Sequence, residues 1–140
     1  MIGYTLQHGD TRGFLLDAKA TCYRSGWGLL AGHDYQLVIL PPDKWNDFDV
    51  PPCDASGTPG QGPFMKAAEG LRTCPDANYM ELLIMVDGNK ATLKKWRAIL
   101  AGGGVYRAPC DGELSACSND VTFMYWNNGG AIYVQVTCLN

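Results

Sequence analysis

The pattern of apolar and polar residues along the chain predicts strands more often than helices. It is clearest at Ala131–Thr137, where the apolar residues Ile132, Val134 and Val136 alternate with more polar ones. Because successive side chains of a strand point to opposite faces, this segment is predicted to be a strand with one buried face. A shorter strand is expected at Gly13–Leu16.

Two further segments are apolar on both faces. Tyr35–Leu40 reads YQLVIL, so we expect it to lie centrally in a sheet. Pro41 and Pro42 are expected to end this strand, because proline cannot donate to the hydrogen-bond ladder. Tyr79–Val86, YMELLIMV, is short and bounded by turn residues, which favours a buried strand over a helix. A strand is also expected at Glu113–Ser118.

Helical spacing of apolar residues occurs in one clear segment, Lys90–Ala101, which reads KATLKKWRAILA. Phe64–Leu71 is long enough for two further helical turns. Short strands separated by turn residues otherwise dominate, so the sequence predicts an all-β fold, a β-sandwich of the jelly-roll type with one or two short helical insertions. We expect a single domain over residues 1–140.

A loop of more than twenty residues, Pro41–Pro63, is rich in Pro, Gly, Asp and Ser. Loops of this length in compact domains are usually functional or disordered. Trp45 and Phe48 favour an ordered loop, because aromatic residues are depleted from segments that never pack. Cys53 and Cys74 are candidates for tying it to the rest of the chain.

Charge and hydropathy exclude two classes of partner. The net charge is −3 and the lysines and arginines are not clustered, so no nucleic-acid surface is expected. The longest apolar runs are far shorter than the ~20 residues needed to cross a bilayer, so no membrane insertion is expected.

Six cysteines, none in a CxxC pair, argue against zinc and favour disulfides in an oxidising compartment. We therefore expect an extracellular or secreted protein, although MIGYTLQHGD lacks the pattern of a secretory signal. A pairing of Cys110 with Cys117 around DGELSA is the one that the sequence suggests, and free buried thiols are the alternative.

Enzyme motifs are missing from the sequence. The two histidines, His8 and His33, lie in turn-like segments, and no GxSxG, P-loop or HExxH motif occurs. A glycan hydrolase would need a second carboxylate facing Asp120 across a cleft, and nothing in the spacing of the acids predicts one. We therefore expect a non-enzymatic protein.

The stretch Asn119–Gly130, NDVTFMYWNNGG, has the composition of a cation site. Asp120, Asn127 and Asn128 lie between two predicted strands and can converge on one hard cation. Calcium takes six to eight oxygen ligands, including carboxylates, amides and backbone carbonyls. The alternative is an ordinary β-turn without metal, since Asn, Asp and Gly are also common turn residues.

Three segments carry a resemblance to a known family. They are SGWGLLAGHDYQLVI, YMELLIMVDG and DGELSACSNDVTFMYWNNGG, in the last of which an Asn-Asn pair follows Asp120 by seven and eight residues. Together they resemble the PA-IL type of calcium-dependent, galactose-binding bacterial lectin, a small β-sandwich related to galactose-binding-like modules. In this chain Met80 and Glu81 stand where the family has two small residues.

The resemblance implies a ligand set and a sugar site. Calcium would be held by Asp120, Asn127, Asn128 and the carbonyls of Met124 and Phe48, and a hexose would bind the ion through vicinal hydroxyls. The residues lining the sugar would be Gln61, Thr58, Pro59 and Trp126, together with Asp120 and Asn127.

Thr58 replaces a family histidine, which puts the preference for galactose in question. Trp126 stands where the family has a small residue, and it is either a stacking surface for the sugar or a packing residue. The expected partners are galactose-type glycans, and a homo-oligomer is left open. The alternative is a disulfide-stapled β-sandwich without metal that acts as a protein-interaction or structural module.

Overall fold

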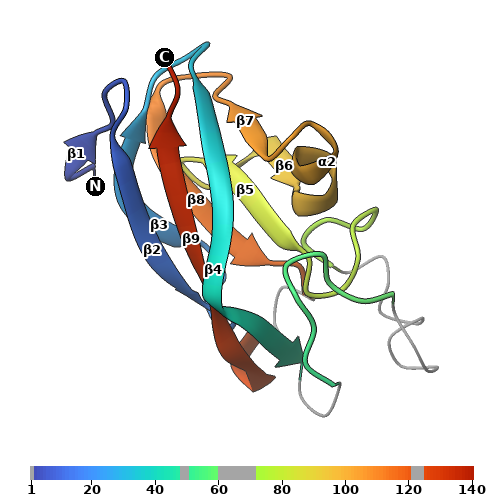
Figure 1. The fold of residues 1–140 in the computed structure, drawn as a ribbon. Coiled ribbons are helices and arrows are strands. Elements are labelled where there is room, and N and C mark those ends of the chain that lie inside the picture. Colours follow the sequence, from blue (N-terminus) through green and yellow to red (C-terminus); the bar gives the residue numbers. More distant parts are fainter. Residues whose placement is uncertain (1, 48–50, 60–71, 121–124) are drawn as a thin grey trace.

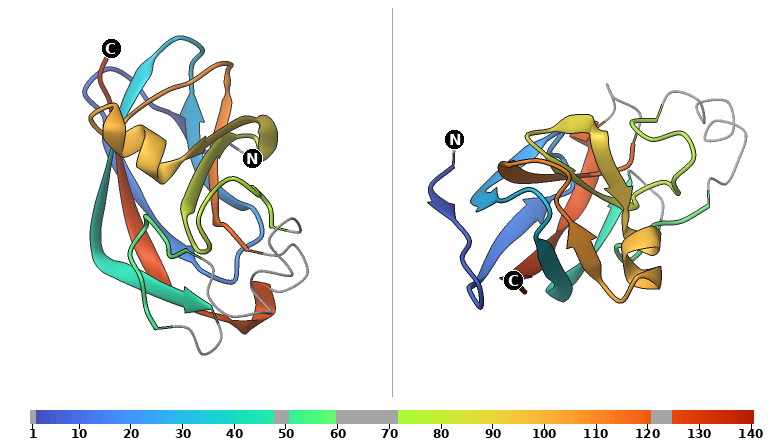
Figure 2. Two further views of the ribbon diagram at one scale, coloured as in Figure 1. Left: turned by 90° about the vertical axis from the view of Figure 1, so that its right-hand side faces the viewer. Right: turned by 90° about the horizontal axis from the view of Figure 1, so that it is seen from above.

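Two β-sheets make up most of the fold, and their strands pair antiparallel except for β1, which pairs parallel with β3 (Figure 1). The computed structural model describes residues 2–47, 51–59, 72–120 and 125–140. One sheet has the strand order β1-β3-β8-β5-β6 and the other β2-β9-β4-β7. The two views of Figure 2 show the sheets as two layers facing each other. The predicted all-β sandwich is confirmed.

The five-stranded sheet includes strands that the sequence pattern did not predict, among them β3. Its strands are β1 (Tyr4–Thr5), β3 (Tyr23–Leu29), β8 (Gly112–Ser118), β5 (Leu82–Val86) and β6 (Asn89–Lys95). The glycines of β3 break the apolar pattern of a strand, and Gly28 is required there by packing. A Cβ there would lie 2.7 Å from the side-chain oxygen of Thr5, so only glycine lets β1 pair closely with β3.

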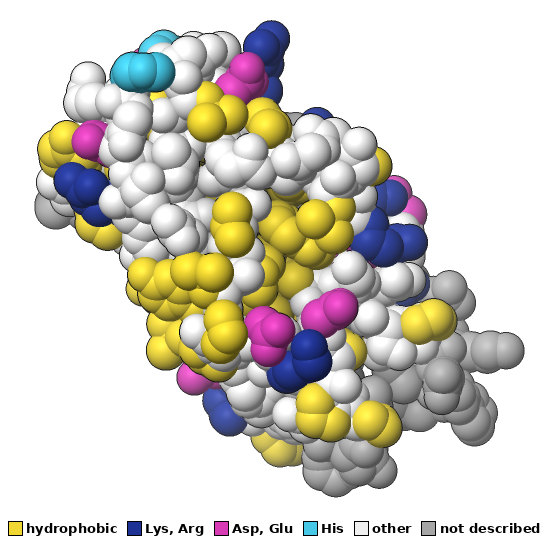
Figure 3. Space-filling model, viewed as in Figure 1, with side chains coloured by type: hydrophobic (Ala, Val, Ile, Leu, Met, Phe, Trp, Pro, Cys, Tyr) yellow, Lys and Arg dark blue, Asp and Glu magenta, His cyan; other side chains and the backbone are white. Residues whose placement is uncertain are grey.

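The four-stranded sheet contains the two strands that the sequence predicts most clearly. Its members are β2 (Thr11–Asp17), β9 (Asn128–Cys138), β4 (Asp34–Asp47) and β7 (Val105–Arg107). Ile132, Val134 and Val136 of β9 are buried, as predicted. β4 lies between β9 and β7, also as predicted, but its outer face is open: Val38 is 41% exposed. Figure 3 shows hydrophobic side chains gathered over this face.

The prediction that Pro41 and Pro42 end the strand is wrong. Leu40 pairs with Tyr133 and Asp43 with Ile132, so the two prolines are a bulge and β4 continues to Asp47. Bulge residues stand outside the ladder, so their missing N–H groups cost no strand pairing. The extension ends where Asp47 pairs with Asn128, at the start of β9.

The predicted helix at Lys90–Ala101 is only half correct. Asn89–Lys95 is the edge strand β6, and the helix α2 begins at Trp96 and ends at Ala101. Lysines suit an exposed edge strand because they discourage pairing with other chains. The helical turn that follows buries Trp96 and Ile99 and links β6 to β7, so it joins the edges of the two sheets.

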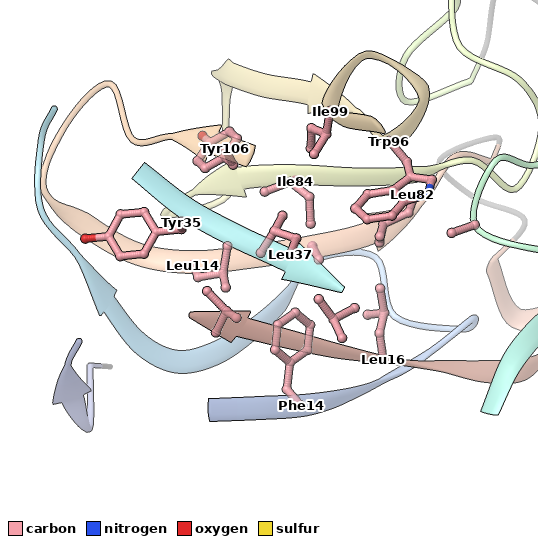
Figure 4. Close-up of a cluster of buried hydrophobic side chains, with 14 of the residues drawn as sticks. Phe14, Leu16, Tyr35, Leu37, Leu82, Ile84, Trp96, Ile99, Tyr106 and Leu114 are labelled. Carbon is pink, nitrogen blue, oxygen red and sulfur yellow. The ribbon is translucent and has the colours of Figure 1, made fainter. Parts of the chain in front are cut away.

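The main core lies between the two sheets (Figure 4). Phe14 and Leu16 from β2 and Leu37 from β4 face Leu82 and Leu114 from the other sheet, and all are buried. A second, smaller cluster lies on the opposite face of β5 and β8; its buried members are Ala77, Leu83, Met85, Cys117 and Tyr125. No helix in the described residues is long and apolar enough to cross a membrane.

The structure does not show the expected disulfides. All six cysteines, each within the described residues, are free thiols. Cys110 and Cys117 cannot pair, because the extended strand from Gly112 to Cys117 alone spans roughly 16 Å at about 3.3 Å per residue. The Cα atoms of a disulfide lie within about 7 Å. Cys53 is held instead by a backbone bridge to Trp45. Secretion, which is predicted from the expected disulfides, therefore stays a prediction that the structure does not support.

Candidate functional site

The end of β8 and the start of β9 meet at one backbone carbonyl. Ser118 Oγ and Asn128 Nδ2 both donate to the carbonyl oxygen of Ala18, at 3.1 and 3.0 Å. Asp120 follows β8 by two residues, and the 3-10 helix η2 (Tyr125–Asn127) leads directly into β9. The Asp and the Asn-Asn pair that the sequence singles out are therefore carried on two chain segments that lie side by side.

Two amide oxygens of this region are buried without a hydrogen bond. Asn127 Oδ1 and Asn128 Oδ1 accept none from the described residues. The Asn128 amide is oriented by its bond to Ala18, which commits Nδ2 and leaves Oδ1 on the other side of the group. A buried acceptor without a donor costs about 1–3 kcal/mol and is rare in proteins. Two on consecutive residues make this pair a candidate for binding a ligand.

Three acidic side chains, those of Glu81, Glu113 and Asp120, are buried in the described part of the chain. Glu81 accepts from the backbone N–H and Nε of Arg97 and from Asn78 N–H. Glu113 accepts from Arg24 Nε at 2.9 Å. The third, Asp120, is 1% exposed and lies in the loop that carries the two asparagines. A carboxylate is kept ionised at such a depth only by compensating partners.

Glu113 also bears on the alternative of a glycan hydrolase. Burial raises its pKa, but hydrogen bonds and positive charge at the carboxylate, with those from Gly26 N–H and Arg24 among them, leave the pKa below its ordinary value. A general acid for glycoside cleavage needs a raised pKa. Glu113 is therefore suited to holding β3 and β8 together rather than to donating a proton.

Asn119 is a structural residue and not a ligand candidate. Its Oδ1 accepts from Cys74 N–H at 2.8 Å, and its Nδ2 donates to the carbonyls of Cys74, Ala77 and Asn78. Every polar atom of its amide is used. Asn119 thus fastens the segment 74–78 beside Asp120.

Met80 joins three parts of the site region. Its N–H donates to the carbonyl of Asn119 and its carbonyl accepts from Trp45 Nε1, both at 2.7 Å. Met80 has φ 60°, a left-handed conformation that glycine adopts without cost. The neighbouring Tyr79 carbonyl accepts from Thr58 N–H at 2.7 Å, which holds the predicted sugar-lining Thr58 to the same region.

The predicted site residues divide into three groups. Asp120 follows the end of β8, and Asn127 and Asn128 lie immediately before and at the start of β9, which meets that end at the Ala18 carbonyl. Thr58 and the exposed Pro59 lie on a loop bound to Tyr79. Phe48, Gln61 and Met124 lie outside the described residues.

Trp126 is 68% exposed, so its interpretation as a packing residue is wrong. Its neighbour Tyr125 points the other way and is 3% exposed. Sequence reasoning missed Tyr125, because no spacing rule distinguishes an inward from an outward aromatic residue within one helical turn.

The donor types present suit one kind of metal. Among the described residues no three His, Cys, Asp or Glu side chains gather as ligands. An ion in this loop would therefore be held by one carboxylate together with amide and carbonyl oxygens. That set fits calcium, which accepts oxygen ligands in irregular geometry, and does not fit zinc.

Comparison with known proteins gives a fold match. No family model matches this chain, and no curated protein sequence matches it. A solved structure, the EclA N-terminal domain, described as a PllA-like lectin, superposes with a TM-score of 0.58 over 90% of this chain and 94% of that domain. The chain has the fold of a PllA-like lectin. The two sequences are 17% identical, so the match concerns the fold, and it agrees with the PA-IL-like fold that the sequence resemblance implies.

Proposed function

We propose that this chain is a calcium-dependent carbohydrate-binding domain in which Asp120, Asn127 and Asn128 hold the ion. The observation that carries the proposal is the pair of buried amide oxygens, Asn127 Oδ1 and Asn128 Oδ1, that accept no hydrogen bond from the described residues. Calcium supplies what both oxygens lack. The backbone carbonyls of Met124 and Phe48 complete the proposed ligand set on the strength of the family resemblance.

The fold supports carbohydrate as the ligand class. The EclA N-terminal domain is described as a lectin, and the site loop of this chain has the spacing of the PA-IL family. We propose Thr58, Pro59 and Gln61 as the rim of the sugar site, with galactose or a related hexose as the ligand. The exposed Trp126, next to Asn127, offers an aromatic face to the apolar side of the sugar ring.

The charge of the site explains why metal and sugar would depend on each other. With one carboxylate, the protein ligands carry a single formal negative charge, and low ligand charge weakens calcium binding. Vicinal hydroxyls of a hexose would add two oxygens to the ion. Each ligand would then raise the affinity of the other by the same factor.

We further propose that the domain binds without catalysis. Both Glu81 and Glu113, the buried carboxylates other than Asp120 in the described residues, are ion-paired with arginine. The alternative, a module held together by disulfides, has no support from the structure, because the six cysteines are free thiols in it.

Isothermal titration of methyl galactoside into the protein, with calcium and again after EDTA, tests the proposal. We expect binding with calcium and none after chelation. Asp120→Asn, which removes the charge at nearly constant size, should abolish the EDTA-sensitive binding. Asp54→Asn is the matched control, because Asp54 is an exposed residue that only accepts from Ser56 N–H. Sugar binding that survives EDTA would refute the calcium mechanism.

A further inference from the structure

The phenol of Tyr125 lies between the end of β8 and the residue that carries the buried carboxylate. Tyr125 is the first residue of η2, and its ring packs in the smaller core cluster beside Leu83 and Cys117. The ring thus packs against β5 and β8, and this packing fixes the position of its hydroxyl. Neither the spacing of the site loop nor the family resemblance assigns this residue a role.

The Tyr125 hydroxyl uses its full hydrogen-bonding capacity. It donates to the carbonyl of Ser118 at 2.6 Å, a much better acceptor than the Cys117 sulfur at 3.9 Å. With its proton committed, it accepts from Thr73 Oγ1 at 2.7 Å and from Asp120 N–H at 3.4 Å. Burial raises the pKa of Tyr125 well above its ordinary value, so the phenol stays protonated at physiological pH.

These bonds fix Asp120 on both sides of its Cα atom. Its N–H is held by Tyr125, and its carbonyl accepts from Thr73 N–H at 2.9 Å. Thr73 and Tyr125 are also bonded to each other, so the three residues form one closed network. A ligand carboxylate must be placed to within a fraction of an ångström, and that placement depends on the backbone that carries it.

We propose that Tyr125 is a positioning residue for calcium, which sets the Asp120 carboxylate through the backbone bonds to Asp120 and Thr73. This inference rests on the proposed function. It assigns Tyr125 no contact with the ion or the sugar.

Tyr125→Phe tests the proposal, because it removes only the hydroxyl. Outer residues that orient metal ligands typically contribute 10- to 100-fold to metal affinity, so we expect calcium binding to weaken by at least about tenfold. Tyr106→Phe is the matched control: Tyr106 is 1% exposed and its hydroxyl donates to Thr92 O at 2.9 Å, within the other core cluster. It should lower the melting temperature by less than Tyr125→Phe, because it loses one hydrogen bond rather than three, and it should leave calcium affinity unchanged.

Terbium(III) luminescence provides a reading that general loss of stability does not change. If Asp120 is displaced, water replaces its oxygen on the ion, so the terbium lifetime in Tyr125→Phe should be shorter than in wild type, with Tyr106→Phe like wild type. Thr73→Val removes the second hydroxyl of the network at nearly constant volume and serves if Tyr125→Phe does not fold; it should weaken calcium binding in the same direction.

The outcomes separate the two proposals. Wild-type calcium affinity and terbium lifetime in Tyr125→Phe, or in Thr73→Val if only that variant folds, would overturn the positioning role alone. A wild-type protein that binds no calcium would overturn the proposed function, and this inference with it.

Discussion

Two buried asparagines, Asn119 and Asn128, should respond in opposite ways to the same substitution. Both are at most 2% exposed, and leucine has the same number and branching of side-chain heavy atoms as asparagine. The Asn119 amide makes four hydrogen bonds, whereas the Asn128 amide makes one, to Ala18, whose carbonyl also accepts from Ser118 Oγ. The structure therefore predicts different costs for Asn119→Leu and Asn128→Leu.

The magnitudes follow from the hydrogen bonds. Asn119→Leu loses the bond accepted by Oδ1 and those of two N–H hydrogens shared among three carbonyls, about 1 kcal/mol for each hydrogen bond, and it leaves buried backbone carbonyls unpaired, so unfolding free energy should fall by about 4 kcal/mol or more. Asn128→Leu loses one bond, about 1 kcal/mol, but it also removes a buried oxygen that accepts no hydrogen bond, which relieves about 1–3 kcal/mol. In EDTA, Asn128→Leu should therefore be within about 1–2 kcal/mol of wild type.

Calcium should stabilise wild type more than it stabilises Asn128→Leu. An ion at 100 times its dissociation constant stabilises the native state by about 2.7 kcal/mol. Wild type should gain this amount when EDTA is replaced by calcium, and Asn128→Leu should gain little or none.

Urea unfolding followed by tryptophan fluorescence, in EDTA and in calcium, measures all these free energies. A loss of about 4 kcal/mol by Asn128→Leu in EDTA would refute the reading of its oxygen as lacking a partner in the metal-free protein. An undiminished gain from calcium in this variant would refute its role as a ligand.

Three other predictions concern single features. Met80→Gly relieves the cost of φ 60° but empties a fully buried position, so urea unfolding should show a net loss of about 1–3 kcal/mol, and a gain would contradict this balance. Trp126→Ala should change stability by less than about 0.5 kcal/mol, because the side chain is 68% exposed, and should weaken sugar binding while calcium affinity stays unchanged; equal loss of both would count against a stacking role. A reducing agent should leave the melting temperature of the purified protein unchanged, because the six cysteines are free thiols, and a fall of several degrees would show that disulfides form.

The strands that could be predicted are those whose pattern is local. β9 has a clean alternation of buried and half-buried residues, and β5 is a short apolar run between turns, so both follow from the sequence alone. β3 and β6 could not be predicted, because β3 contains glycines and β6 contains lysines, which are not typical of strands. These segments form strands because they pair with β8 and β5. The continuation of β4 past Pro41 and Pro42 likewise depends on pairing with β9, a contact distant in the chain.

The site shows the same division. The spacing from Asp120 to Asn127 and Asn128 indicates the ligand candidates, because carboxylate and amide oxygens at the ends of adjoining strands suit a cation. The positions of Asn119 and Tyr125 depend on hydrogen bonds to residues 73–78, more than forty residues away. Such bonds leave no periodic signal in the sequence, so the residues that hold the site in place appear only in the fold.

Calcium titration of chelator-treated protein, with and without methyl galactoside, tests whether the ion and the sugar bind together at this site. We expect one ion bound per chain, with a lower dissociation constant when the sugar is present, and loss of this binding in Asn127→Ala. A protein that takes up no calcium under either condition, or whose calcium affinity does not change with sugar, would contradict this expectation.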